Sequence, residues 1–144
     1  MATPSTLDGQ KLYIKVETSE GSGVFNHPCL INAARGLELT SQGNDVYIID
    51  CDDPDAPAIR EHLKTGVEAS VTGEGQLDLA ALPAYTAWWK ADLAKSVQVW
   101  FGTIGYIEMN MKLTAFSTPA ERGDKVQCSL SLVSHGAIGD YTVV

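Results

Sequence analysis

The sequence lacks clusters of basic residues. Its 10 lysine and arginine residues stand against 18 aspartate and glutamate residues, which gives a formal net charge of −8 at pH 7. The basic residues are scattered singly along the chain. A protein that grips nucleic acid needs clustered cations to displace the counterions of the phosphate backbone. The composition therefore argues against a nucleic-acid-binding domain and predicts a surface that repels phosphates.

Long hydrophobic runs are also missing. The longest apolar runs are a few residues, far short of the roughly 20 that a membrane-spanning helix needs. The N-terminal segment MATPSTLDGQK has neither a basic start nor an apolar stretch, so we expect no secretory signal and folding in a cytoplasm. No membrane partner is predicted.

Cysteine is scarce and shows no pattern. The 3 cysteines, Cys29, Cys51 and Cys128, are widely spaced and odd in number. A disulfide framework needs an even set at short spacings. We therefore expect free thiols that are mostly buried.

The motifs of common catalytic sites are absent. The sequence contains no G-x-S-x-G elbow and neither of the glycine-rich phosphate-binding loops. One carboxylate pair, Glu121 and Asp124, lies in a polar loop segment. The sequence therefore predicts no catalytic residue, no cofactor and no enzymatic activity.

One stretch, YIIDCDDPDAPAIREHLKTG, concentrates acidic residues around a cysteine and a histidine; its aspartates are Asp50, Asp52, Asp53 and Asp55. An EF-hand loop starting at Asp50 or Asp53 fails, because neither register has glycine at its sixth position. Cys51 and His62 lack the paired spacings of zinc sites. We therefore predict no metal here. Asp55 is expected to cap a short helix over about 57–64, with the other aspartates in a solvated loop.

Most of the remaining chain alternates between apolar and polar residues. Alternation is strongest in residues 11–17, 67–72, 97–101, 105–116 and 126–135, and weaker in 29–34, 36–41 and 45–50. The clearest apolar series is Ile107, Met109, Met111, Leu113 and Ala115. A period of two is typical of half-buried antiparallel strands.

One segment, DLAALPAYTAWWKADLAKS, departs from this alternation and predicts a helix over about 82–95, with Pro83 in its first turn. Its apolar stripe, expected to pack on a sheet, is Leu82, Tyr85, Trp89 and Leu93. Trp88 points about 100° away from Trp89 and is a candidate subunit contact.

These elements predict a mainly β fold, an antiparallel β-sandwich or partly closed barrel with one flanking helix and a long acidic loop. We expect a single domain over 1–144. Within it, residues 1–10 form a flexible N-terminal arm, 42–66 form the long loop, and 136–144 form a C-terminal tail.

The order of these elements resembles that of the major tail tube proteins of long-tailed bacteriophages, a family that also forms the tails of gene transfer agents. The segments that carry the resemblance are VTGEGQLD, LPAYTAWWKADLAKS and VQVWFGTIGYIEMNMKLTAFS. Together with the acidic loop, the likeness spans most of residues 8–140. It implies a structural protein with a β-sandwich fold.

The resemblance also implies an assembly. Six copies would form a ring, with their inner sheets joined edge to edge around a channel, and the rings would stack into a tail tube. The tube would enclose the tape-measure protein, meet a tail terminator and a distal tail protein, and conduct DNA without binding it specifically. The protein would be assembled in the host cytoplasm and reside in the tail of the virion.

Residue roles follow from that resemblance. The polar faces of 105–116 and 126–133 suit a water-filled lumen, and the candidate lumen residues are Glu108, Asn110, Lys112, Gln127, Ser129 and Ser131. The acidic loop becomes a contact between subunits or rings, with candidate residues Asp50, Asp52, Asp53, Asp55, Arg60 and Lys64. The two terminal segments are further candidate contacts.

Three alternatives remain open. A different tail component of similar fold, such as a tail terminator or a secretion tube, would share this layout. A small carbohydrate-binding β-sandwich could use Trp88, Trp89 and Trp100 as stacking platforms, although Trp89 is assigned to the helix core and Trp100 is expected to face the helix. A metal-dependent enzyme built on the Asp/Cys/His loop comes third.

Overall fold

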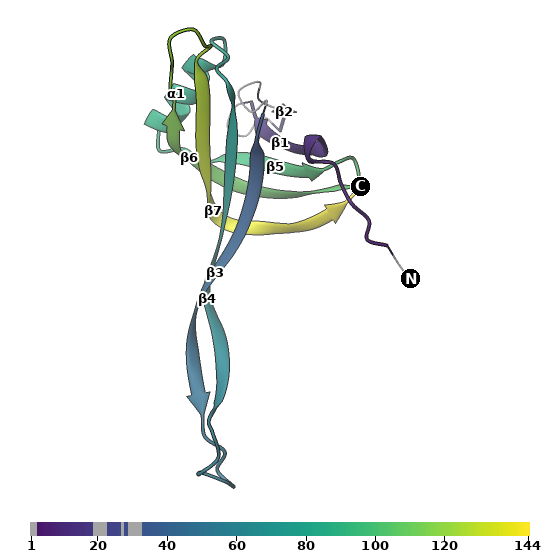
Figure 1. Cartoon of the computed structure of the whole chain (residues 1–144), viewed down its shortest axis with the longest axis vertical. Coiled ribbons are helices and arrows are strands. Elements are labelled where there is room, and N and C mark those ends of the chain that lie inside the picture. The colour runs from purple at the N-terminus through teal and green to yellow at the C-terminus, as the bar shows by residue number, and fades with distance from the viewer. Residues whose placement is uncertain (1–2, 19–22, 27, 29–32) are drawn as a thin grey trace. The chain divides into compact units, whose positions relative to one another are not determined.

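The computed structural model describes residues 3–18, 23–26, 28 and 33–144, and Figure 1 shows their arrangement. The strands are β1 (Leu12–Glu17), β2 (Phe25–Asn26), β3 (Arg35–Ile48), β4 (Ile59–Gln76), β5 (Lys95–Phe101), β6 (Gly105–Ser117) and β7 (Gln127–Val143). A short 3₁₀ turn, η1 (Gly9–Lys11), precedes β1, and the helix α1 (Leu82–Lys90) lies between β4 and β5. The strands form one 7-stranded sheet in the order β2-β1-β5-β6-β7-β4-β3.

The predicted fold class is confirmed: the chain is mainly β and antiparallel, with one helix in the described part. The chain divides into two compact units. We call Met1–Glu38 with Ala69–Val144 the body, and Leu39–Glu68 the hairpin. Strands β3 and β4 each contribute residues to both units.

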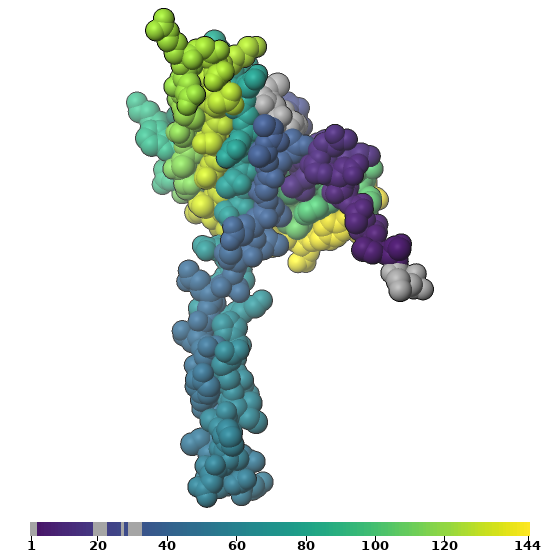
Figure 2. Space-filling model, in the orientation of Figure 1, coloured from purple at the N-terminus to yellow at the C-terminus, as the bar shows by residue number. Residues whose placement is uncertain are grey.

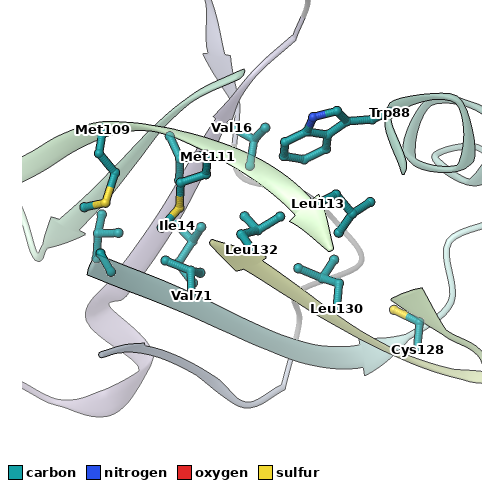
Figure 3. Close-up of a cluster of buried hydrophobic side chains, with 13 residues drawn as sticks. Ile14, Val16, Val71, Trp88, Met109, Met111, Leu113, Cys128, Leu130 and Leu132 are labelled. Atoms are coloured by element: carbon teal, nitrogen blue, oxygen red, sulfur yellow. The ribbon is translucent and has the colours of Figure 1, made fainter. Parts of the chain in front are cut away.

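The body has a hydrophobic core. It is made by the inward-facing residues of strands in which buried and exposed side chains alternate. Neighbouring strands place apolar residues opposite each other, as in the pairs Ile14 with Val99 and Val97 with Met109. Figure 3 shows side chains from β1, β4, β6 and β7 converging, with Trp88 entering from α1. The buried apolar residues are Ile14, Val16, Ala69, Val71, Trp88, Val97, Val99, Met109, Met111, Leu113, Cys128, Leu130 and Leu132.

The sheet of the body folds over on itself. Ile14 on β1 and Val71 on β4 are both fully buried in this core, although their strands are far apart in the sheet order. Arg35, at the start of β3, donates hydrogen bonds to the carbonyl oxygens of Leu12 and, at 2.7 Å, of Gln10. The guanidinium therefore links two strands near opposite edges of the sheet.

A register shift in β6 changes which of its residues face the core. Leu113 pairs with Leu132, but Ala115 then pairs with Ser131, so β6 carries one extra residue. Beyond such a bulge, the positions that would have faced the core face outward, and their neighbours face the core instead. Ala115 is exposed, and Phe116 packs against the core instead. The predicted alternation is therefore right as far as Leu113 and wrong at Ala115.

Strand β7 bends at a second irregularity. Met111 pairs with Ser134 and Met109 with Ile138, so β7 carries extra residues there, including Gly136 at φ 85°. Beyond this bend the strand continues to Val143, paired with β6. The predicted C-terminal tail is therefore wrong, because most of residues 136–144 form a sheet strand.

The helix is shorter than predicted and buries a different tryptophan. It ends at Lys90, so Leu93 lies in the following loop and is 44% exposed. Trp88 is 4% exposed whereas Trp89 is 57% exposed. The helical face with Tyr85 and Trp88, three residues apart, packs on the core. The prediction that Trp89 and Leu93 pack on the sheet is wrong, whereas Tyr85 does contact the core, and Leu82 is half-buried.

The hairpin replaces three predicted elements, two weak strands and one short helix. The weak segments 36–41 and 45–50 fall largely within one strand, β3, and the predicted helix over 57–64 is instead the beginning of β4. Pairing with β3 gives these residues backbone partners that a short isolated helix would lack. The acidic residues therefore sit in a loop over 49–58, and Asp55 caps no helix. The predicted strand over 29–34 and Cys29 lie largely outside the described residues.

Candidate assembly surfaces

The hairpin exposes large apolar side chains to solvent. Its residues are exposed throughout, apart from the half-buried Ala56, and Figure 2 shows the two strands as a narrow ribbon. The exposed large apolar residues are Leu39, Val46, Tyr47, Ile48, Ile49, Ile59, Leu63 and Val67. A two-stranded ribbon has no core in which to bury them. Exposed large apolar side chains gathered on one short segment are typical of an interaction site.

Polar contacts connect the two strands of the hairpin. His62 Nδ1 lies 2.7 Å from Asp45 Oδ1, and Arg60 places a guanidinium nitrogen 3.9 Å from the other oxygen of the same carboxylate. Thr40 donates a hydrogen bond to Glu68 at 3.0 Å. Gly43 leaves room for the imidazole, because a Cβ there would lie 2.7 Å from His62 Nε2. These contacts hold the two strands of the hairpin together, while its large apolar residues stay exposed.

The structure places the candidate contact residues of the acidic loop on the surface. Asp50, Asp52, Asp53 and Asp55 are exposed in the loop, whereas Arg60 and Lys64 lie on β4. The backbone N–H of Asp52 donates to Asp50 Oδ1 at 3.0 Å, which closes a local turn. Within the described ranges, no three histidine, cysteine or acidic residues converge in a way that could hold a metal ion.

The thiols differ from the expectation that they are mostly buried. Cys51 is exposed in the acidic loop, and only Cys128 is buried among the described cysteines. Burial raises the pKa of the Cys128 thiol.

We also find no helix, among the residues described, that is long and apolar enough to cross a membrane.

Strand β7 has an open backbone edge. Its pairing with β4 covers Gln127–Val133. Its pairing with β6 continues to Val143. In the sheet order β7 lies between β6 and β4, so beyond Ser134 only one side of the strand is paired within the described chain. Unpaired strand edges are templates for pairing with another chain.

The candidate lumen residues lie on the face of β6 and β7 that points away from the core. Their alternation with Met109, Met111, Cys128 and Leu130, which are buried, places them there. Glu108, Asn110 and Gln127 are exposed, and Lys112, Ser129 and Ser131 are half-buried. On the neighbouring strand β5, Ser96 donates a hydrogen bond to Asn110 at 3.0 Å. The polar face therefore extends over three strands.

The charges on this face are mixed. Lys112 Nζ lies 2.7 Å from Asp92 Oδ1, in the loop after α1. The hydrogen bond and charge of Lys112 lower the pKa of Asp92. An open cavity of about 420 Å³ lies beside this pair, lined also by Glu17 and His135. Ion pairing therefore offsets the positive charge of this lysine.

Trp100 belongs to the same outward face. Its ring stacks on Tyr106 from β6 with centroids 4.6 Å apart. The ammonium of Lys15 from β1 lies 4.5 Å from the Trp100 ring centroid. Because β1 and β6 flank β5 on opposite sides, both faces of the indole are covered. The expectation that Trp100 faces the helix is wrong, because its neighbour Val99 takes the core-facing position.

No protein-family model matches this sequence, and no curated protein is significantly similar to it. Solved structures do match in fold. A chain from the tail of an empty gene transfer agent (GTA) particle, determined with C6 symmetry, is 20% identical with a TM-score of 0.77, and the match covers 95% of this chain and 99% of that one. The chain has the fold of tail tube subunits.

Two further structures extend this likeness. The SPP1 tail tube protein is 9% identical with a TM-score of 0.63, over 96% of this chain and 78% of that one. The cap that terminates the tube of an anti-feeding prophage is 11% identical with a TM-score of 0.62, over 100% of this chain and 94% of that one. The similarity to this family that the sequence suggested is therefore confirmed at the level of the fold.

Proposed function

We propose that this chain is the structural subunit of a tail tube, in which copies form hexameric rings that stack around a channel. The observation that carries the proposal is the match to a chain of a C6-symmetric tail over 95% of this sequence. A match over 95% of this chain takes in residues of both the body and the hairpin.

Two surfaces support self-association. The second half of β7 offers a backbone edge, and edge-to-edge pairing between copies would satisfy its N–H and C=O groups. The hairpin exposes its apolar residues at 40% to 67% each. These residues lie on both faces of the hairpin, because successive side chains of a strand point to opposite sides.

The outward face of β5, β6 and β7 is our candidate for the lumen wall. Its candidate residues carry hydroxyl, amide and oppositely charged groups, which hold water and offer no cluster of cations for phosphates. DNA could then slide past without specific binding.

The tape-measure protein, a tail terminator and a distal tail protein are the other proposed partners, and the proposed location is the tail of a virion. We propose no enzymatic role.

Negative-stain electron microscopy of the purified protein tests this proposal. At high protein concentration and physiological salt we expect long tubes with a stain-filled bore and sixfold end views. Protein that stays monomeric under these conditions, and that is missing from tails when the particles are isolated, would overturn the proposal.

The acidic loop can be tested separately. Deletion of residues 51–57 should leave a soluble, folded body but abolish tube formation, because the loop is proposed to reach a neighbouring subunit or ring. A replacement of the same residues by an equally long Gly-Ser segment separates loop length from acidic character. Normal tubes from the deletion variant would show that the loop makes no necessary contact.

One observation favours a second function within the same class. The cap of an anti-feeding prophage tube matches 100% of this chain, so a terminating role would also fit the fold. The same micrographs distinguish the two, because a terminator forms single rings.

A carbohydrate-binding role has less support, because Lys15 and Tyr106 cover both faces of Trp100.

A further inference from the structure

The body carries an apolar groove at the end of its sheet where the N-terminal segment, the β5–β6 turn and the end of β7 meet. Its volume is about 400 Å³, within the size range of ligand-binding clefts. The apolar residues that line it are Leu7, Phe101, Ile104, Ile107 and Tyr141. Leu7 is 41% exposed, Ile104 61% and Tyr141 47%, so the groove leaves large apolar side chains in water.

The walls of this groove are held in place by the backbone. Gly102 N–H donates to the carbonyl oxygen of Lys11 at 2.8 Å, and Val144 N–H donates to that of Ile104 at 2.8 Å. The rings of Phe101 and Tyr141 meet edge to face with centroids 5.9 Å apart. The groove is therefore formed before any partner arrives, which lowers the entropic cost of binding.

The groove adjoins the open edge of β7. Tyr141 lines the groove and also belongs to the half of β7 that, among the described residues, pairs with β6 alone. Val143 and Val144, 70% and 74% exposed, continue the apolar surface along the same strand end. A backbone edge beside an apolar groove suits an extended partner strand that carries large aliphatic side chains.

One segment of this same chain has those properties. The hairpin consists of two extended strands, and Ile48, Ile49 and Ile59 are exposed where the strands meet the loop. These three isoleucines are 46%, 58% and 67% exposed, so each leaves a large aliphatic side chain available to a partner. A second copy of the chain therefore supplies an occupant of fitting chemistry.

We propose that the groove and the adjoining edge of β7 receive the hairpin of a second copy, with Ile48, Ile49 and Ile59 entering the groove. This inference rests on the proposed tube function and identifies where the hairpin docks. In a ring or a stack this contact is head-to-tail, with each copy giving its hairpin to one neighbour and its groove to another. Such contacts propagate into closed rings or open stacks instead of stopping at a dimer.

Paired variants test this contact. Ile104→Asp places a carboxylate in the groove and Ile59→Asp places one on the hairpin. Leu79→Asp, at a residue that is 74% exposed and outside both surfaces, adds the same charge as a matched control. Desolvating a carboxylate should raise the concentration needed for assembly on the order of tenfold or more for the first two variants. Leu79→Asp should assemble like the wild type.

Mixing the variants separates a shared contact from two unrelated defects. The Ile59→Asp chain retains an intact groove, and the Ile104→Asp chain retains an intact hairpin. Their mixture should therefore regain one productive contact for each pair of chains, seen as heterodimers in sedimentation velocity. Circular dichroism of each variant checks that it is folded.

Cross-linking gives an independent measurement. In a background with Cys29→Ser and Cys51→Ser, one tagged chain carries Ile104→Cys and a differently tagged chain carries Ile59→Cys. We expect an inter-chain disulfide that links the two tags, and none when Leu79→Cys replaces Ile104→Cys. Normal tubes from Ile104→Asp without this cross-link would overturn the groove but leave the tube function standing. Wild-type protein that never assembles would overturn both.

Discussion

The indole N–H of Trp88 donates a hydrogen bond to the carbonyl oxygen of Leu93 at 2.9 Å. The chain leaves the helix at Ala91, whose backbone is extended, and then turns back toward the indole. A buried tryptophan needs a partner for its N–H, and the loop after α1 supplies one. This bond explains how Trp88 can be the residue that enters the core.

Replacing the two adjacent tryptophans should have very different effects on stability. Trp88→Ala should lower the free energy of unfolding by about 3–5 kcal/mol, because it empties a core position. Trp89→Ala should change it by no more than about 0.5 kcal/mol in the monomer. Urea unfolding of dispersed protein, followed by circular dichroism, measures both. Equal losses would contradict the burial of Trp88.

Gly139 should tolerate no side chain. A Cβ at this position would lie 2.3 Å from the carbonyl oxygen of Glu108 on β6. Gly139→Ala should therefore force β6 and β7 apart and cost about 1–3 kcal/mol. Gly66→Ala is the matched control, because a Cβ there meets nothing within 4 Å. Thermal unfolding of the two variants should differ, with Gly66→Ala at least as stable as the wild type.

The ion pair of Asp92 and Lys112 should contribute to stability only above acidic pH. The pKa of Asp92 is lowered in the folded state, chiefly by the hydrogen bond from Lys112. Its contribution is therefore present above the ordinary carboxyl pKa of 3.8 and disappears as the pH falls through the lowered value.

Asp92→Asn tests this pH dependence. The variant should unfold at a slightly lower urea concentration than the wild type at pH 7, and the difference should shrink as the pH falls below 3.8. The effect should be small, because the Asp92 side chain is 91% exposed and solvent screens the pair. A difference that grows on acidification would have the wrong sign.

The Arg35 guanidinium should hold the folded-over sheet together. Arg35→Ala removes charge-assisted hydrogen bonds to the carbonyl oxygens of Leu12 and Gln10, each worth about 1.5–3 kcal/mol. Amide hydrogen exchange of β1 should accelerate in this variant. Arg122→Ala, in the exposed connection before β7, is the control and should leave β1 exchange unchanged.

The sequence predicted the apolar positions of the strands better than their ends. Alternation correctly placed Ile14, Val97, Met109 and Leu132 in the core. It missed the reversal at Ala115, because a bulge depends on the register of the partner strand. It also missed the continuation of β7 past Gly136, where residues 136–144 were expected to form a C-terminal tail.

The candidate surfaces were predicted unevenly. Alternation identified the polar residues on the outward face of β6, since each lies next to a core residue. The run from Val46 to Ile49 was assigned to a weak strand, and nothing in the local pattern showed that its apolar side chains stay exposed. The apolar groove was missed altogether, because Leu7, Ile104 and Tyr141 are distant in sequence.

The sequence by itself determined the mainly β class, the antiparallel strands and the position of the helix, because these depend on local periodicity and turn chemistry. Only the tertiary structure decided that Trp88 is buried in place of Trp89, that residues 59–66 form a strand, and that the edge of β7 is open. Each of these depends on a partner that is remote in the chain: the core under the helix, strand β3 beside β4, and the point where β4 separates from β7.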